Sequence, residues 1–120
     1  MNKGLILHIL IFTAIAIVAT YFLRDTKDEV FKITAYCNCS KCSDIWGNIT
    51  KTGIKPYLGI CAVDPKVIPL GSYVYIERLG MFKAEDIGSK IKGRTIDVYM
   101  SSHQRALDFG VQYLRARIIK

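Results

Sequence analysis

The sequence lacks the features that mark fibrous and disordered chains. It has only 3 prolines and 9 glycines in 120 residues, shows no internal repeat or low-complexity tract, and is 51% hydrophobic. A collagen-like, coiled-coil or intrinsically disordered protein is therefore excluded. The chain is also too short for a (β/α)8 barrel, or for a nucleotide-binding domain joined to a substrate domain. We expect one small folded domain.

Acidic residues are scarce as well. The chain has 10 Asp and Glu against 17 Lys and Arg, and residues 30–120 alone carry the full net charge of +7. A basic domain of this kind could meet nucleic acid, anionic lipid or an anionic cell wall. The charge alone does not distinguish among these partners, so the cellular compartment has to be predicted as well.

The N-terminal segment predicts the compartment. Residues 4–23 contain no charged side chain, and 20 helical residues are enough to cross a hydrocarbon layer about 30 Å thick. The basic Lys3 before this segment favours residues 1–3 in the cytoplasm, a single-pass anchor over 4–23 in the lipid bilayer, a linker over 24–29, and a domain over 30–120 outside the cytoplasm. A cleaved signal peptide is the alternative and would make the domain secreted, although no convincing Ala-x-Ala site precedes Arg24. Both alternatives argue against nucleic acid as a partner.

The remainder of the chain predicts a mainly β fold. Short runs of β-branched and aromatic residues, separated by Gly and Pro turns, predict six strands: 30–36, 59–63, 73–77, 81–85, 95–99 and 114–119. One short helix is expected after the fifth strand, with a capping box from Ser101 to Gln104 and a stop at Gly110. Six strands in about 90 residues suggest a small closed barrel, which leaves no sheet edge exposed.

Three aspartates lie at strand ends or beside glycines, each flanked by apolar residues: Asp64, Asp86 and Asp97. Burial raises the pKa of a carboxyl group, and a second carboxylate nearby raises it further. A carboxylic acid that stays protonated near neutral pH is what the cleavage of a glycosidic bond requires. The alternative is ordinary turn chemistry, in which Asp caps a loop beside Pro or Gly.

The segments around these aspartates carry a resemblance. Residues 62–71 (AVDPKVIPLG), 84–93 (AEDIGSKIKG), 96–99 (IDVY) and 102–107 (SHQRAL) resemble the 3D domain, which is named for three aspartates. The resemblance runs from about Ile33 to Ile118. The 3D domain is similar to the catalytic barrel of MltA-type lytic transglycosylases and of the stationary-phase-survival wall enzymes. It therefore implies a six-stranded double-psi β-barrel.

The resemblance also implies roles for individual residues. Asp97 matches the general acid, Asp86 matches an aspartate close to that acid, and Asp64 matches the first of the three. Residues outside the aspartates are expected to bind substrate: Thr52 in the Thr50–Gly53 loop, the basic Lys92 and Arg94, and His103. A solvated basic face is the alternative for the cations, and a surface or capping role is the alternative for His103.

The implied reaction cleaves peptidoglycan between N-acetylmuramic acid and N-acetylglucosamine, with Asp97 as a single acid/base and without a cofactor. The sequence departs from the family pattern at Ile87 and Ser89, where Thr and Gly are commoner, and it contains no large second domain. A non-catalytic module that binds cell-wall polysaccharide on the same barrel is therefore the alternative function.

Four cysteines allow three kinds of chemistry: Cys37, Cys39, Cys42 and Cys61. Outside the cytoplasm they could form two disulfides, and their count also suits a tetrahedral zinc site with four thiolate ligands. Reduced thiols are the third alternative. Cys37 and Cys39 are close in sequence, so each is expected to pair elsewhere. No histidine lies within the sequence cluster.

Overall fold

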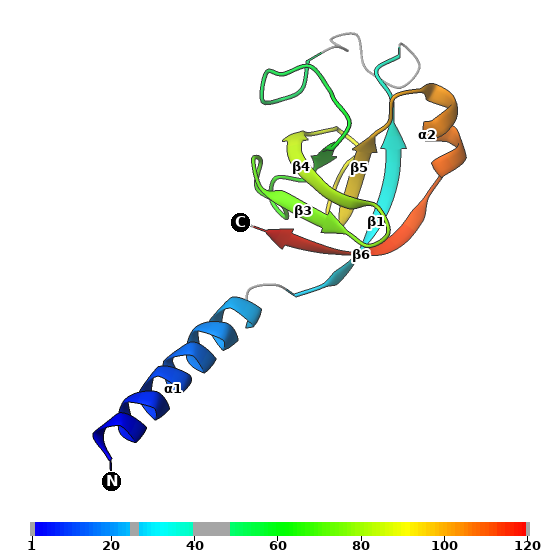
Figure 1. The fold of residues 1–120 in the computed structure, drawn as a ribbon. Coiled ribbons are helices and arrows are strands. Elements are labelled where there is room, and N and C mark those ends of the chain that lie inside the picture. Colours follow the sequence, from blue (N-terminus) through cyan, green and yellow to red (C-terminus); the bar gives the residue numbers. More distant parts are fainter. Residues whose placement is uncertain (1, 25–26, 40–48, 120) are drawn as a thin grey trace.

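The computed structural model describes residues 2–24, 27–39 and 49–119. Six strands close into one barrel in the order β1-β5-β2-β4-β3-β6 (Figure 1). The strands are β1 (Glu29–Tyr36), β2 (Ile60–Val63), β3 (Tyr73–Ile76), β4 (Gly80–Asp86), β5 (Thr95–Tyr99) and β6 (Gln112–Ile119), and the helices are α1 (Lys3–Arg24) and α2 (His103–Phe109). The prediction of a mainly β, six-stranded barrel with one short helix is confirmed, and each predicted strand is present within two residues of its expected ends.

Two pairs of strands in the barrel are parallel. β1 runs parallel to β5, and β2 runs parallel to β4, while the other neighbours are antiparallel. Parallel neighbours need long crossover connections, so residues far apart in sequence meet at the same barrel end. The carboxyl ends of β1 and β5 therefore lie together, and α2, which follows β5, packs against β1 (Figure 1).

Side chains of alternate residues fill the barrel interior. Phe31 and Ile33 of β1 and Ile96 and Val98 of β5 are buried in one apolar cluster. Because successive residues of a strand point to opposite faces, the residues between and beyond them face away from this core. The core thus fixes which side of the barrel carries the polar residues of β1 and β5.

The short helix begins one residue later than its expected capping box. Ser102 is the N-cap, and its hydroxyl accepts a hydrogen bond of 3.2 Å from the Arg105 amide. The predicted box started at Ser101 and ended at Gln104, so this detail of the prediction is wrong. The predicted stop is confirmed, because Gly110 ends the helix at φ 63°, a conformation that glycine adopts without strain.

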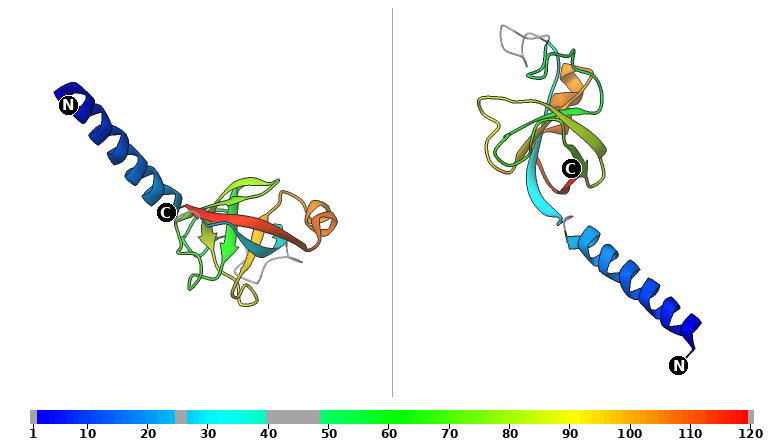
Figure 2. Two further views of the ribbon diagram at one scale, coloured as in Figure 1. Left: turned by 90° about the horizontal axis from the view of Figure 1, so that it is seen from below. Right: turned by 90° about the vertical axis from the view of Figure 1, so that its left-hand side faces the viewer.

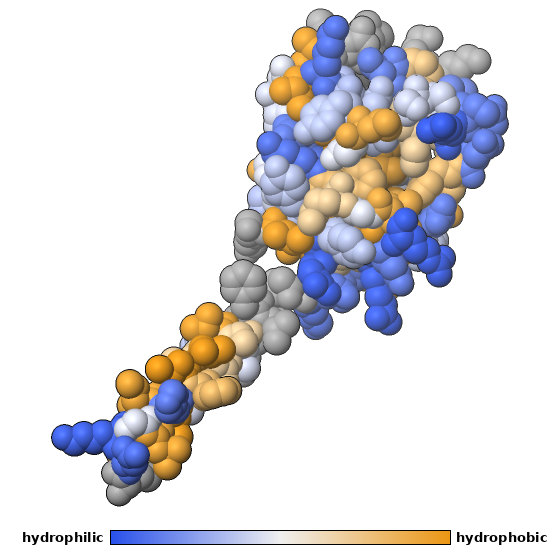
Figure 3. Space-filling model, viewed as in Figure 1, coloured by the Kyte–Doolittle hydropathy of each residue, from blue (hydrophilic) through white to orange (hydrophobic). Residues whose placement is uncertain are grey.

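Helix α1 projects away from the barrel in all three views (Figures 1 and 2). Its surface is largely hydrophobic (Figure 3), and the described side chains between Lys3 and Tyr21 are exposed. This stretch is long and apolar enough to cross a membrane, and none of it is buried against the rest of the chain. A helix this apolar is expected to leave water for an apolar environment.

Candidate functional site

Four residues on neighbouring strands form a row on the outer side of the barrel. Asp97 of β5 pairs with Thr34 of β1 on one side and with Ala62 of β2 on the other. Ala62 pairs in turn with Asp86 of β4. Side chains at paired positions project from the same face, so the two carboxyl groups flank the small methyl group of Ala62.

Asp97 lies in a setting that favours its protonated form. Burial raises the pKa of this carboxyl, the Thr34 hydroxyl opposes the shift, and the negative charge of Asp86 adds to it, so the pKa is above its usual range. The Thr34 Oγ1 donates a hydrogen bond of 2.8 Å to Asp97 Oδ1. The sequence-based expectation of a raised carboxyl pKa is confirmed at this position.

A β-bulge in β4 sets the direction of the Asp86 side chain. Cys61 is opposite Ala84, but the next residue, Ala62, is opposite Asp86, so Glu85 is an extra residue in β4. Bulges commonly re-aim a side chain beside a functional site. The Asp86 Oδ1 accepts hydrogen bonds from the amides of Lys51, at 3.0 Å, and of Ile87, at 2.9 Å, which hold its carboxylate in place.

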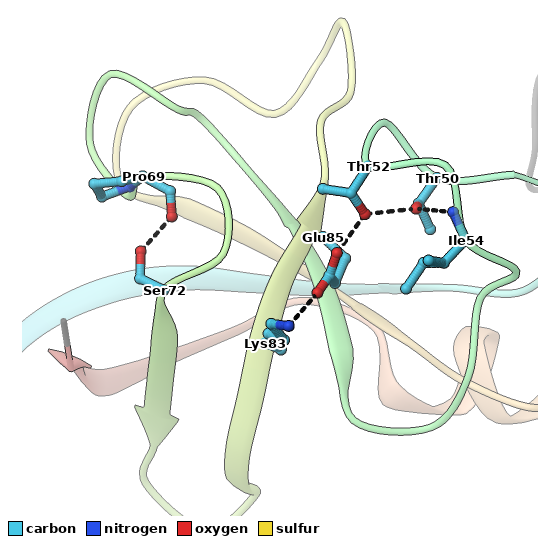
Figure 4. A network of polar contacts seen from close by, with 7 residues as sticks. All are labelled: Thr50, Thr52, Ile54, Pro69, Ser72, Lys83 and Glu85. Carbon is cyan, nitrogen blue, oxygen red and sulfur yellow. Dashed lines mark hydrogen bonds and ion pairs between the residues drawn. The ribbon is translucent and has the colours of Figure 1, made fainter.

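The extra residue of the bulge ties the Thr50–Ile54 loop to β4 (Figure 4). Glu85 is buried, accepts a hydrogen bond from the Thr52 hydroxyl, and forms an ion pair of 2.9 Å with Lys83. These two partners lower the pKa of Glu85, the Thr52 hydroxyl more than Lys83. The hydroxyl of Thr52, a predicted substrate ligand, therefore serves to hold the loop. Sequence reasoning missed Glu85, because an acidic residue beside Asp86 gives no sign of burial.

Asp64 has a different environment from the other two aspartates. Its Oδ1 accepts from the Lys66 amide at 3.0 Å, and its Oδ2 accepts from the Gly93 amide at 2.8 Å. The Gly93 amide and then the Lys66 amide hold the pKa of this carboxyl below its usual range. The expectation that burial raises the pKa of Asp64 is therefore wrong, because two backbone donors outweigh burial. Its carboxylate connects the end of β2 to the β4–β5 loop.

The remaining predicted ligands are spread over the surface. Lys92 is exposed, and its charge contributes to the low pKa of Asp64. Arg94 is also exposed and forms an ion pair of 3.2 Å with Glu29 at the start of β1. His103 lies at the beginning of α2, beside the cysteines that follow β1. The structure thus brings Asp86 and Asp97 together and distributes these cations around other parts of the barrel.

Tyr36 lies near the two carboxyl groups, and sequence reasoning missed its place at the site. Its hydroxyl is buried and makes no hydrogen bond within the described part of the chain. Burial raises the pKa of this phenol above its usual range, and the charges of Asp86 and Asp97 add to the rise. The ring packs edge-on against Tyr99 with centroids 5.6 Å apart. Nothing in a strand pattern reveals a hydroxyl that lacks a partner.

The cysteines separate into two environments. Cys61 is fully buried in the apolar core, where burial raises the pKa of its thiol to about 12. The Sγ atoms of Cys37 and Cys39 lie 2.7 Å apart, although each of these cysteines is expected from the sequence to pair elsewhere. His103 Nδ1 is 3.7 Å from Cys37 Sγ and 3.4 Å from Cys39 Sγ. This group differs from the expected set of four thiols, because a histidine joins it and Cys61 does not; Cys42 lies outside the described residues.

One hollow of about 300 Å³ lies at the other end of β1. It is lined by residues of the linker, β1, β6 and the loop before β3: Lys27, Glu29, Phe31, Val67, Pro69, Ala116 and Ile118. None of the three aspartates lines it, so this hollow is not part of the carboxylate site.

Comparison with known proteins identifies the domain. Residues 60–120 match the sequence profile of the 3D domain. The chain is 43% identical over 75 residues to the cell wall-binding protein YocH of Bacillus subtilis (strain 168), a match that covers 59% of this chain and 26% of YocH. It is 41% identical over 100 residues to the putative cell wall shaping protein YabE of the same organism, covering 80% of this chain and 24% of YabE.

The chain therefore spans only about a quarter of the length of these two relatives. A structural likeness to the crystal structure of MltA from E. coli has a TM-score of 0.50 at 20% identity, and covers 60% of this chain and 27% of MltA. That likeness agrees with the barrel fold. The matched profile, which covers half of the sequence, shows that the chain belongs to the 3D domain family.

Proposed function

We propose that the protein is a membrane-anchored enzyme that cleaves the glycan strands of peptidoglycan in the manner of a lytic transglycosylase. A role at the cell wall is supported by the family and by relatives named for cell-wall binding and shaping. The single observation that carries the catalytic proposal is Asp97, a half-buried carboxyl with a raised pKa beside a second carboxylate. A general acid for glycosidic cleavage needs this combination.

The proposed reaction uses Asp97 twice. The protonated carboxyl donates its proton to the oxygen between N-acetylmuramic acid and N-acetylglucosamine as the bond from that oxygen to C1 breaks. The carboxylate that remains accepts the proton of the muramoyl 6-hydroxyl, and the oxygen of that hydroxyl bonds to C1. The product is a 1,6-anhydro ring, no water is consumed, and Asp97 ends the cycle protonated. One acid/base therefore suffices, whereas hydrolysis usually employs two carboxylates.

The neighbours of Asp97 have supporting roles in this proposal. Burial raises the pKa of Asp97 and the negative charge of Asp86 adds to the rise, so Asp97 stays protonated to higher pH. The hydroxyl of Tyr36, which is buried and has no partner in the described part of the chain, donates to a sugar oxygen once substrate binding uncovers it. Asp64 acts as a positioning residue through the two hydrogen bonds that its carboxylate accepts from the Lys66 and Gly93 amides. The exposed cations Lys92 and Arg94 attract the carboxylates of muramic acid and of the peptide stems.

We further propose that residues 4–23 anchor the protein in the membrane with the barrel outside the cytoplasm. The support is the apolar helix, whose described residues are exposed to the surroundings along the stretch from Lys3 to Tyr21. Cell fractionation tests the anchor, because an uncleaved protein pellets with membranes and retains its first residues in N-terminal sequencing. A soluble protein that begins after Arg24 would instead indicate a signal peptide.

A binding module is the second candidate function. YocH is named a cell wall-binding protein, and the outer faces of β3 and β6 expose three tyrosines: Tyr73, Tyr75 and Tyr113. Aromatic rings of this kind offer flat apolar surfaces with a polar end, which suits contact with sugar rings. In this alternative the protein adheres to glycan strands without cutting them.

Product analysis separates the two functions. The full-length protein in detergent is incubated with purified peptidoglycan in water enriched in ¹⁸O, and the soluble muropeptides are analysed by mass spectrometry. Products that end in 1,6-anhydro-muramic acid and contain no ¹⁸O support the proposal. Reducing-end products that carry ¹⁸O would identify a hydrolase, and a protein that pellets with the wall without releasing product would identify a binding module.

A further inference from the structure

We propose that Cys37, Cys39 and His103 form a zinc site at the end of the barrel, separate from the carboxylates. The two cysteines directly follow β1, and His103 is the first residue of α2. Their ligand atoms all lie within 4.8 Å of one another. Two soft thiolates and one imidazole are ligands that zinc prefers.

The distances from the imidazole to the sulfurs fit one tetrahedral ion. With Zn–S bonds of about 2.3 Å and a Zn–N bond of about 2.0 Å, tetrahedral angles place a nitrogen and a sulfur ligand about 3.5 Å apart. The observed separations from His103 Nδ1 are 3.4 Å to Cys39 Sγ and 3.7 Å to Cys37 Sγ. A single ion can therefore touch the nitrogen and either sulfur without any movement of the helix.

The separation between the sulfurs is the distance that metal binding must change. The Sγ atoms of Cys37 and Cys39 are 2.7 Å apart, whereas two thiolates on one tetrahedral ion lie about 3.8 Å apart. An S–S bond, the competing arrangement, requires about 2.05 Å. Rotation of the Cys39 side chain, which is only half-buried, provides the opening of about 1 Å that the ion needs.

The parallel pairing of β1 with β5 explains why residues so far apart in sequence meet here. The two strands end side by side at the Tyr36–Tyr99 pair, and the Met100 amide donates a 2.7 Å hydrogen bond to the Tyr36 carbonyl. The chain then enters α2 at Ser102, whose capping bond fixes the position of the first turn. Cys37 is consequently buried beside the start of the helix, with an exposed fraction of 2%.

A metal at this point would connect the two strands that carry Thr34 and Asp97 beyond their last paired residues. The proposed acid/base chemistry does not use the ion. The three side chains leave the fourth tetrahedral position to a water or a further ligand, and the bound ion would contribute to folding free energy and hold the end of β1 against α2. The zinc proposal is therefore independent of the proposed cleavage reaction. Either can fail without the other.

The test is the metal content of the full-length protein, purified in detergent under reducing conditions and then supplied with zinc. We expect one zinc per chain, and loss of that zinc in Cys37→Ser, Cys39→Ser and His103→Ala. Two matched controls lie elsewhere in the chain: Cys61→Ala removes a thiol of the core, and His8→Ala removes the other histidine. Both controls should keep their zinc.

Two further measurements keep the test independent of folding defects. Cobalt in place of zinc should give thiolate-to-metal absorption that weakens in each cysteine variant. A chelator should lower the Tm of the wild-type protein and leave the Tm of His103→Ala unchanged, because a ligand that binds only the folded state stabilises it. Wild-type protein without zinc, equal zinc in wild type and His103→Ala, or a Cys37–Cys39 disulfide that persists under the reducing preparation would overturn the proposal.

Discussion

Asp86 and Asp97 lie opposite the same residue, Ala62, from the strands on its two sides. Two strand spacings separate their backbones by about 10 Å, and the methyl group of Ala62 leaves the space between their side chains open. The charge of Asp86 therefore reaches Asp97 and helps to raise its pKa. This arrangement places two carboxyl groups on one face of the barrel, and one of them, Asp97, has a raised pKa.

Removing the Thr34 hydroxyl should shift the pH dependence of cleavage. The hydroxyl stabilises the Asp97 carboxylate, so Thr34→Val raises the pKa of Asp97 further. Cleavage requires protonated Asp97 and falls as pH rises through that pKa; the falling limb of the rate profile should therefore move to higher pH. The other titratable groups near Asp97 are Asp86, Tyr36 and Cys61, and the substitution leaves all three in place. A limb that stays in place or moves to lower pH contradicts the role of Asp97.

The variant Tyr36→Phe should lower the rate of cleavage without lowering the free energy of unfolding. The hydroxyl is buried and lacks a hydrogen-bond partner within the described residues, so its removal should leave the free energy of unfolding unchanged or raise it by about 1 kcal/mol. If the hydroxyl donates to a sugar oxygen, the rate of cleavage should fall by about 2- to 10-fold. Urea unfolding and product release measure the two quantities, and the exposed Tyr113→Phe is the control. A clear loss of stability would instead indicate a structural hydroxyl.

Asp64 should support stability at neutral pH and lose that effect in acid. Because its folded-state pKa is lowered, its contribution is present above the ordinary aspartate pKa of about 3.9 and disappears as pH falls through the folded-state value. We expect Asp64→Asn to lower the Tm at neutral pH, with a difference from wild type that narrows in acid. The exposed Asp108→Asn on α2 is the matched control and should change the Tm little. A difference that stays constant with pH would contradict the carboxylate's role.

Gly88 should tolerate no side chain beside Ile91. A Cβ atom at Gly88 would lie 2.9 Å from Ile91 Cγ1, and this branched neighbour has little freedom to retreat. Gly88→Ala should therefore lower the free energy of unfolding by about 1–3 kcal/mol. The double variant with Ile91→Ala removes the clashing atom and should cost less than the two single changes together. Additive costs in denaturant unfolding would show that the contact does not limit the substitution.

Much of the fold could be predicted because strand patterns are local. The alternation of Phe31, Ile33 and their polar neighbours marks one core-facing side, and the turn residues separate the strands. The prediction that Asp86 is close to Asp97 depended on the family resemblance and agrees with their pairing to Ala62. The sequence alone contains no signal for strand order in a barrel with two parallel pairs.

The parts that could not be predicted depend on that long-range register. The bulge at Glu85, the backbone donors to Asp64, and the meeting of His103 with Cys37 all arise where distant segments come together. Local periodicity does not encode such contacts. Flanking apolar residues therefore predict the right direction of the pKa shift for Asp97 and the wrong direction for Asp64.

Asp97 is the proposed acid/base of glycan cleavage. The rate at which the full-length wild type and Asp97→Asn release anhydro-muropeptides from purified peptidoglycan tests this role. Asparagine keeps the size of the side chain and its capacity to accept the Thr34 hydrogen bond, so folding and pelleting with the wall should persist. This role of Asp97 predicts that wild type releases 1,6-anhydro products and that Asp97→Asn, although folded and wall-bound, releases them at least about 100-fold more slowly. Equal rates for the two proteins would contradict it.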